Sequence, residues 1–441
     1  MAPLFGTDGI RGLAGQPPLD PDTVSRIGSA LVASLLDSGH RVPPIRVVVG
    51  CDTRESSPWI VASLNGGILG AGGSILFAGV VPTPAVAYLV RTLGADAGIS
   101  ISASHNPWQD NGVKIFSDAG RKLPDEVEAE IEALIAGASP VPAVEAAVTE
   151  GLAGRYVDHL PSALPCSLDG MRIVLDAANG AAHRVGVEAF RRAGAEVIPF
   201  FADPDGRNIN RDCGALHPGA MARMTVESGA DMGLALDGDA DRAMVADDRG
   251  VILDGDEILY LWARELVREG KKPNAVVGTV MSNLGLELAL REIGIRLLRA
   301  SVGDRYVTEM MEKENVLLGG EQSGHLIRTD LTTTGDGVLT GLHVAATIVL
   351  GGALSKQPRL TRAPQILRNI RVREKRPFDQ IPGLHEEQSR CEALLDGKGR
   401  ILLRYSGTEA LARVMVEGME PGVVETVAAS LARRIEEAIG A

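Results

Sequence analysis

Apolar runs alternate with polar loops and helical stretches along most of the chain. The run at 45–50 (IRVVVG) ends in glycine, and a polar loop, a helical stretch at 59–69 and a second apolar run at 72–77 follow it. Short β-branched runs bounded by glycine and polar residues are typical of buried strands. The order of strand, loop, helix and strand therefore predicts a βαβ unit in a parallel sheet.

The same order of elements occurs twice more. The strands and helices of the two later copies are predicted at 172–176, 187–192, 195–200, 275–280, 284–291 and 295–300. Copies at domain-sized spacing predict a repeated architecture rather than one large sheet. The fold class is therefore α/β, with three similar α/β domains that have mixed, mostly parallel sheets.

The last part of the chain has a different pattern. It becomes more charged after Pro364 and predicts strands at 400–404 and 413–417 and a helix at 423–439, which together form a C-terminal α+β domain that moves relative to the rest. Composition shifts place the boundaries near 150, 252 and 366, with 136–149 as a connector. The predicted domains are 1–150, 151–252, 253–365 and 366–441.

Composition and charge narrow the function. The chain has 441 residues, too many for one hydrophobic core, and its net charge of −13 argues against nucleic acid and anionic membranes as partners. Its four cysteines are scattered without a Cys-x-x-Cys pair, which suits a reducing compartment and disfavours zinc or a disulfide framework. With no signal segment and no long apolar run, a soluble cytoplasmic protein is expected.

A serine-rich loop follows the strand predicted at 97–101. It reads Ser102-Ala-Ser104-His-Asn-Pro107, and Asn111-Gly112 makes a turn after it. The carboxyl end of a strand is where α/β sheets commonly carry active residues. A serine here could be a nucleophile or a phosphate carrier, or the hydroxyls could only cap turns.

An acidic loop offers three carboxylates at alternate positions, Asp237, Asp239 and Asp241, followed by Arg242. Carboxylates this close repel one another unless a cation neutralises them, and hard cations prefer such oxygen ligands. The spacing does not fit a calcium-binding EF-hand loop. Arg242 could neutralise part of the charge or hold a phosphate in a bidentate pair.

Two further polar loops lie downstream. The loop at 319–325 offers Glu321, Ser323 and His325 to sugar hydroxyls, although a lone histidine is more often structural. The loop at 404–409, with Arg413 beyond it, could expose backbone N–H groups to a phosphate, or could be an ordinary hairpin.

Taken in order, five motifs match one family. They are residues 5–12 (FGTDGIRG), 102–107 with 110–114, 237–242, 320–325 and 404–409. Along essentially its whole length the chain resembles the α-D-phosphohexomutases. Gln322 resembles the branch that acts on glucosamine phosphates, because the glucose and mannose branch usually carries methionine there.

The resemblance implies a role for each motif. Ser104 would carry the phosphate and would bind one Mg²⁺ together with Asp237, Asp239 and Asp241. The residues implied to act on the substrate are Lys114, Arg11 and Arg242 at the transferring phosphate, Glu321 and Ser323 at the sugar, and Arg404, Ser406, Gly407, Thr408 and Arg413 at the other phosphate. His325 and Lys114 are the candidates for the general acid or base.

The implied reaction interconverts glucosamine 6-phosphate and glucosamine 1-phosphate, with glucosamine 1,6-bisphosphate as intermediate and activator. The expected partner is a small phosphosugar, and the resemblance also suggests a homodimer. The product would supply amino-sugar nucleotides and cell-wall precursors. Three alternatives stay open: a glucose or mannose enzyme of the same family, a magnesium-dependent phosphatase with Asp237 as nucleophile, and a non-catalytic sensor.

The last loop departs from the family pattern. Phosphohexomutases commonly read Arg-Pro-Ser-Gly-Thr-Glu-Pro there, whereas Tyr405 and Ala410 replace the two prolines in this chain. Because proline restricts the unbound backbone, we expect this loop to be looser before the substrate binds.

Overall fold

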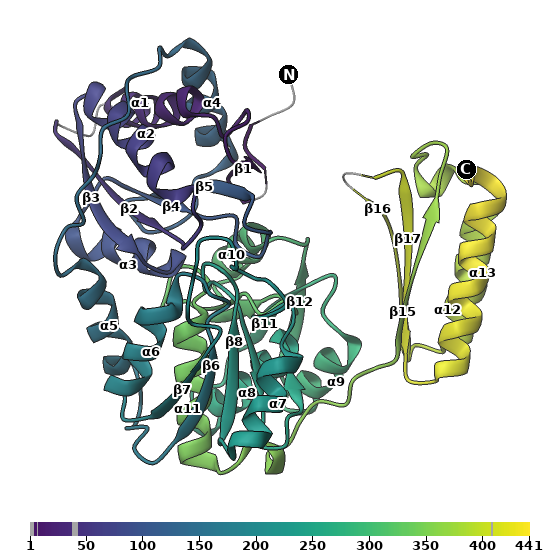
Figure 1. The fold of residues 1–441 in the computed structure, drawn as a ribbon. Coiled ribbons are helices and arrows are strands. Elements are labelled where there is room, and N and C mark those ends of the chain that lie inside the picture. Colours follow the sequence, from purple (N-terminus) through teal and green to yellow (C-terminus); the bar gives the residue numbers. More distant parts are fainter. Residues whose placement is uncertain (1–3, 7, 38–42, 407–408) are drawn as a thin grey trace.

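The computed structural model describes residues 4–6, 8–37, 43–406 and 409–441. This described part of the chain forms four sheets, each with its own helices (Figure 1). We call each sheet and its helices a unit, numbered in chain order. No helix among the described residues is both long and apolar enough to cross a membrane.

The first unit contains a five-stranded sheet. Its strands, in spatial order, are β1 (Ile10–Leu13), β5 (Asp110–Ser117), β4 (Ala97–Ile101), β2 (Ile45–Cys51) and β3 (Gly73–Val80). β2 runs parallel to β3 and β4, whereas β5 pairs antiparallel with both of its neighbours, β4 and β1. The helices are α1 (Pro21–Asp37), α2 (Ser57–Gly70), α3 (Thr83–Leu93) and α4 (Asp125–Gly137). Val47 and Val49 pack among residues of α1 and α2, and Val48 packs among residues of α3, so both faces of the sheet are covered.

The second and third units repeat this plan. The second sheet has the order β10 (Ile252–Leu253), β9 (Ala243–Ala246), β8 (Met232–Leu236), β6 (Arg172–Asp176) and β7 (Glu196–Phe200), with helices α5 (Leu152–Ser162), α6 (Ala182–Arg192) and α7 (Gly219–Ser228). The third has β12 (Arg296–Ala300), β11 (Ala275–Thr279), β13 (Leu318–Gly320) and β14 (Leu326–Arg328), with helices α8 (Gly255–Arg268), α9 (Leu284–Glu292), α10 (Asp304–Lys313) and α11 (Gly337–Gly351).

Each of these three sheets has three parallel strands and an antiparallel edge. The strands and helices predicted for the three βαβ units are all present, and the α/β fold class is confirmed. The antiparallel edge matters because β4–β5 and β8–β9 are hairpins. Their connecting loops therefore lie at the carboxyl ends of β4 and β8.

Helix α11 joins the second and third units. It is buried along most of its length, and it packs against α5, α6, β8 and β9 of the second unit although it follows the third sheet in sequence. A boundary near 252 falls inside β10, and the largest hydrophobic core runs through both units. The predicted division at this point separates sheets that share a core, and the limits of the domains stay a proposal.

The connector predicted at 136–149 begins inside α4 and then runs along the first unit. The Val144 N–H donates to the Ala62 carbonyl, and the Thr149 N–H donates to the Phe77 carbonyl. These backbone hydrogen bonds fasten the connector to α2 and β3.

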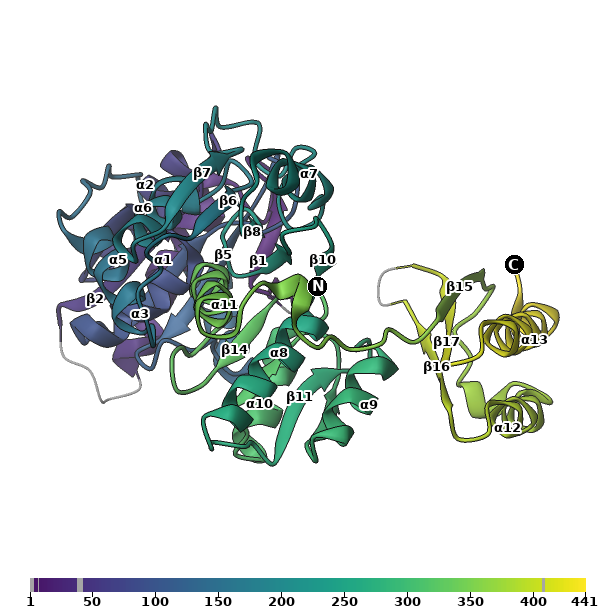
Figure 2. The same ribbon diagram turned by 90° about the horizontal axis from the view of Figure 1, so that it is seen from below.

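The fourth unit is an antiparallel sheet with two helices. Its strands are β15 (Gln365–Arg371), β17 (Leu411–Gly418) and β16 (Gly399–Tyr405), and its helices are α12 (Leu384–Leu395) and α13 (Pro421–Ile439). Its own hydrophobic core lies between the sheet and the helices. Both views show this unit standing apart from the other three (Figures 1 and 2). Arg400 joins it to the third unit by donating to the carbonyls of Val280 and Ser282.

Candidate active site

Ser104 lies in the hairpin loop between β4 and β5, at the edge of the first unit. Its side chain is buried, and its backbone has a φ of 52°, in the left-handed region. Its Oγ donates to Asp237 Oδ2 at 2.5 Å and lies 3.3 Å from Nδ1 of His105. The loop therefore presents a hydroxyl directly to the second unit.

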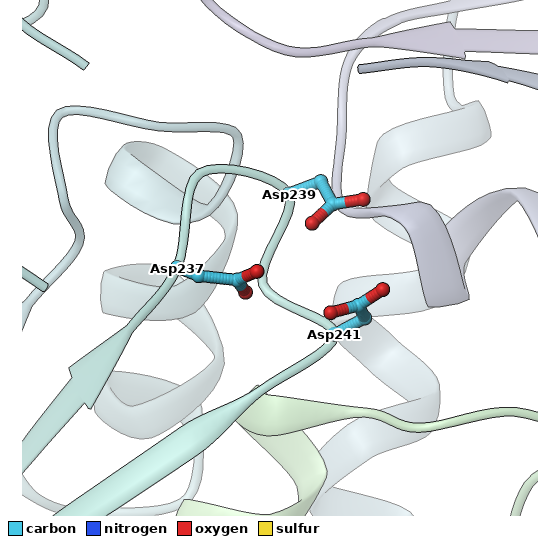
Figure 3. A group of neighbouring side chains, drawn as sticks. All are labelled: Asp237, Asp239 and Asp241. Atoms are coloured by element: carbon cyan, nitrogen blue, oxygen red, sulfur yellow. The ribbon is translucent and has the colours of Figure 1, made fainter. Parts of the chain in front are cut away.

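The three aspartates occupy the matching loop between β8 and β9 (Figure 3). Asp237, Asp239 and Asp241 are buried, and one carboxylate oxygen from each lies within 4.8 Å of the others. Oδ1 of Asp239 and Oδ1 of Asp241 are buried and accept no hydrogen bond from any described residue. Gly238 permits the close approach, because a Cβ there would lie 2.5 Å from the Ser104 carbonyl oxygen.

This arrangement fits a hard cation. Burial raises the pKa of Asp237 well above its usual value, and the neighbouring Asp241 and Asp239 raise it further. Three buried carboxylates with unsatisfied oxygens are the ligand chemistry that Mg²⁺ prefers. The three side chains are thus candidate ligands for a metal ion.

Lys114 compensates part of this negative charge. From β5 its buried Nζ lies 2.8 Å from Asp239 Oδ2, 3.1 Å from Asp241 Oδ2 and 3.2 Å from Asp8 Oδ2. Burial lowers the pKa of Lys114, but the three carboxylates outweigh burial and raise it well above its usual value. Lys114 is therefore a fixed positive charge beside the three aspartates.

Arg242 directly follows Asp241 at the end of the aspartate loop. Its backbone N–H donates to Asp237 Oδ1 at 3.2 Å, and its Nε lies 3.9 Å from Asp241 Oδ1. Burial lowers the pKa of Arg242, but Asp237 and Asp241 outweigh it and raise the value. Because its buried Nε has no hydrogen-bond partner among the described residues, the guanidinium can still receive an anion.

Asp8 lies at the centre of a charged cluster that the sequence pattern did not predict. Its carboxylate forms ion pairs with Arg11, Lys114 and Lys122, and Lys122 also pairs with Asp304. Burial raises the pKa of Asp8, but Lys114, Lys122 and Arg11 outweigh it and hold the value well below the usual range. Asp8 lies inside the 5–12 motif, so a signal was present there, whereas no role was predicted for Lys122 or Asp304.

The loop at 319–325 connects β13 to β14 and reaches the same centre. The Ala243 N–H donates to the Gly324 carbonyl, which ties this loop to the aspartate loop. His325 is buried, and its Nε2 lies 3.6 Å from Asp304 Oδ2. Neither ring nitrogen has a hydrogen-bond partner among the described residues. A Cβ at position 335 would lie 2.5 Å from the imidazole, so Gly335 makes room for this ring.

Glu321 and Ser323 lie beside His325. The buried Glu321 accepts a hydrogen bond from the Gly303 N–H at its Oε1, at 3.0 Å, and interacts electrostatically with Arg242. Ser323 is half-buried in the same turn. The sugar contacts implied for these two side chains stay a prediction.

The remaining candidates belong to the fourth unit. Arg404 on β16 lies directly across from Arg413 on β17, and burial together with Arg413 lowers the pKa of Arg404. Like charges placed opposite each other destabilise a sheet, and an anion between them relieves the repulsion. Ser406 is buried, and its Oγ accepts a hydrogen bond from the Glu409 N–H at 3.3 Å. Gly407 and Thr408 lie outside the described residues.

Tyr405, which stands where the family commonly has proline, makes specific contacts at the base of the loop. Its ring stacks on Phe378, with centroids 4.4 Å apart and an interplanar angle of 8°, and its hydroxyl donates to the Arg376 carbonyl at 2.5 Å. The Lys375 Nζ donates to the Ser406 carbonyl at 2.6 Å. Aromatic stacking and two hydrogen bonds thus hold the base of the loop, and the expected loosening before the substrate binds stays a prediction.

Comparison with known proteins covers nearly the whole chain. The four family models of phosphoglucomutase/phosphomannomutase match it in order: alpha/beta/alpha domain I at residues 2–142, domain II at 154–250, domain III at 254–360 and the C-terminal domain at 367–434. The phosphoglucosamine mutase of Gluconacetobacter diazotrophicus is 46% identical, over 99% of this chain and 98% of that protein. That of Anaeromyxobacter dehalogenans is 44% identical, over 99% of each.

Solved structures show the same fold. A phosphoglucomutase/phosphomannomutase family protein from Burkholderia thailandensis has a TM-score of 0.79 at 23% identity and covers 99% of this chain and 97% of its own. The N-acetylphosphoglucosamine mutase of Aspergillus fumigatus, solved with GlcNAc-6P and magnesium, has a TM-score of 0.65 at 18% identity, over 99% and 96%. With four consecutive domain models and full-length relatives, this chain belongs to the phosphoglucomutase/phosphomannomutase family, the α-D-phosphohexomutases.

Proposed function

We propose that the protein is a phosphoglucosamine mutase, which interconverts glucosamine 6-phosphate and glucosamine 1-phosphate through glucosamine 1,6-bisphosphate. The observation that carries this proposal is the contact between Ser104 Oγ and Asp237, which puts a hydroxyl against three buried carboxylates. The glucosamine specificity is supported by relatives of that name at 44–46% identity over almost the full chain.

The reaction begins with a phosphate on Ser104. The oxygen of the sugar 1-hydroxyl forms a bond to phosphorus, the bond from phosphorus to Ser104 Oγ breaks, and the hydroxyl proton passes to a base. His325 is the stronger candidate for that base, because both its ring nitrogens lack a partner among the described residues. Lys114 is already engaged with three carboxylates, so its role is to stabilise the transferring phosphate by charge.

Asp237, Asp239 and Asp241 would hold one Mg²⁺ together with a phosphate oxygen on Ser104. When bound, the ion neutralises negative charge on the transferring group. Arg242 and Arg11 would supply further positive charge to the same phosphate. Since this transfer needs positioning and charge neutralisation more than covalent assistance, a buried cluster of fixed charges is suited to it.

The bisphosphate then has to turn so that its 6-phosphate faces Ser104 and returns to it. A separate anion site accepts whichever phosphate is not reacting, and the opposed Arg404 and Arg413, with Ser406, Gly407 and Thr408, are the residues proposed for it. Because the fourth unit stands apart from the other three units, closure of this unit over the sugar would complete the site and exclude water.

The proposal includes a cellular role. An aminosugar 1-phosphate is a substrate for nucleotide transfer, so the product would feed amino-sugar nucleotides and cell-wall precursors in the cytoplasm. All four cysteines are free, which suits that compartment. A homodimer also belongs to the proposal, and light scattering of the purified protein tests it.

Two activity measurements test the function. Ser104→Ala is expected to abolish turnover, and activity above about one per cent of wild type would remove the phosphoserine route, since loss of a nucleophile costs several orders of magnitude. Turnover of glucosamine, glucose and mannose 6-phosphates is expected to be highest for glucosamine. Preference for glucose or mannose would assign the chain to the other branch of the family instead.

A further inference from the structure

Arg54 is a fully buried arginine whose side chain reaches the serine loop from the loop after β2. Its NH2 donates to the Ser104 carbonyl at 3.1 Å and to the Asn106 carbonyl at 2.9 Å. Its NH1 donates to the Asp110 carbonyl at 3.0 Å and also to the Pro107 carbonyl. One guanidinium thus donates hydrogen bonds to four carbonyl oxygens of the loop that carries Ser104.

Asp52 fixes this guanidinium. Its Oδ2 accepts a hydrogen bond from Arg54 Nε at 2.8 Å and another from Ser102 Oγ at 2.6 Å. Ser102 Oγ in turn accepts a hydrogen bond from the Ser104 N–H at 2.9 Å. Both backbone polar groups of Ser104 are therefore tied to the same carboxylate, one through Ser102 and the other through Arg54.

Asn210 holds the same carbonyls from the second unit. Its Nδ2 donates to the Ser104 carbonyl at 2.9 Å and to the Asn106 carbonyl at 3.1 Å. Residues of both the first and the second unit consequently donate hydrogen bonds to the serine loop. Ser104 faces Asp237 across the boundary between these two units.

The backbone conformation of Ser104 explains why these hydrogen bonds are needed. A left-handed backbone is strained for a residue with a side chain, so the loop would relax without external support. The contacts of Arg54 go to backbone carbonyls and to Asp52, and they leave Oγ untouched. The same hydrogen bonds can therefore hold the backbone of Ser104 with and without the phosphate on its side chain.

We propose that Arg54, held by Asp52, is a positioning residue for phosphoryl transfer that fixes the backbone of Ser104 so that Oγ faces the aspartates in both states of the cycle. This inference rests on the proposed function. The competing explanation is an ordinary buried ion pair that contributes only to folding. The two differ in what they predict for the chemical step.

The experiment compares Arg54→Met and Arg54→Lys with a matched control, Arg359→Met. Arg359 also forms ion pairs with two largely buried carboxylates, those of Glu257 and Asp247, but it is not paired with any described residue of the serine loop. Each purified protein is assayed for kcat and KM, for thermal unfolding, and for the ³¹P NMR resonance of phospho-Ser104.

For Arg54→Met we expect kcat to fall at least about a hundredfold with KM changed less than about threefold, because misplacing a reacting group by an ångström costs this much. The ³¹P resonance should shift or broaden, and Arg54→Lys should recover part of kcat. Arg359→Met should unfold at a lower temperature with kcat and the resonance unchanged.

Two results would overturn the inference: a kcat for Arg54→Met within about threefold of wild type, or an unchanged ³¹P resonance with activity lost only in proportion to unfolded protein. If Arg54→Met does not fold, Asn210→Gly replaces it, because glycine tolerates the left-handed backbone at that position. Asn210→Gly should lower kcat about tenfold, with KM retained. An unchanged kcat would reject the claim that hydrogen bonds to the loop carbonyls position Ser104. Wild-type protein without turnover or phosphoserine would instead reject the proposed function.

Discussion

Ser104 Oγ donates a hydrogen bond to Asp237 Oδ2 at 2.5 Å, although the two residues are 133 positions apart and belong to different sheets. The contact exists because each residue occupies the hairpin loop at the carboxyl end of a parallel strand, β4 in one unit and β8 in the other. Two copies of one architecture thus face each other through equivalent loops. The proposed metal site and the proposed phosphate carrier meet at that junction.

Removing one carboxylate should separate stability from activity. Asp237→Asn relieves repulsion within the metal-free triad, so the free energy of unfolding should stay equal or rise by about 1 kcal/mol. Turnover should fall at least about a hundredfold, and added Mg²⁺ should no longer raise the unfolding temperature. Calorimetry with EDTA or Mg²⁺ measures both effects.

The exposed Glu130 provides the control for that variant. Glu130→Gln removes the same charge far from the triad and should change neither turnover nor the response to Mg²⁺. A full Mg²⁺ response in Asp237→Asn would show that the ion binds somewhere else.

Tyr405 should act on substrate binding rather than on chemistry. Tyr405→Ala loses the stacking on Phe378 and the hydrogen bond to Arg376, so KM for the sugar phosphate should rise about three- to tenfold with kcat little changed. Tyr405→Phe keeps the stacking and should lie between the variant and wild type. Steady-state kinetics decide the matter, and a fall in kcat at unchanged KM would contradict this role.

His343 should make stability depend on pH. It lies on α11, edge-on to Trp262, and burial and the nearby Arg328 lower its pKa to about 4, against the opposing effects of Asp330 and Glu269. Below about pH 6.5 the histidine of the unfolded chain binds a proton, whereas that of the folded protein stays neutral down to about pH 4. The free energy of unfolding should therefore fall as the pH drops from about 6.5 to 4, by at most about 3 kcal/mol from this residue.

The variant His343→Leu isolates that contribution. Urea unfolding of both proteins at a series of pH values gives the free energy of unfolding of each, and the wild-type value minus the variant value should fall as the pH drops through this window. A difference that is constant from pH 7 to 4 would show that His343 titrates normally in the folded protein.

The sequence predicted those parts of the molecule that depend on local pattern. The β-branched runs before polar loops marked the strands of the three βαβ units, and the alternate aspartates marked a cation site, because repulsion between close carboxylates is a local property. The roles of Arg54 and Asp52 were not predicted, since Asp52-Thr53-Arg54 reads only as a polar loop after a strand. What Arg54 does depends on where the chain returns half a hundred residues later, at 104–110.

Long-range pairing accounts for the other omissions. Asp8, Lys122 and Asp304 form one charged cluster, yet nothing in the spacing of these three positions indicates contact. Helix α11 is apolar around its circumference, a pattern that predicts burial but not which sheet it meets. Its packing on the second unit follows from the return of the chain after β14.

Isotopically labelled phosphate on Ser104 gives the most direct measurement. Enzyme carrying ³²P on this residue is mixed with a small excess of glucosamine 6-phosphate and Mg²⁺, and a single turnover is quenched and separated. The label should leave the protein at the rate of turnover and appear first in glucosamine bisphosphate and then in glucosamine monophosphates. Label that stays on the protein while sugar is converted, or that emerges only as inorganic phosphate, would contradict the transfer from Ser104.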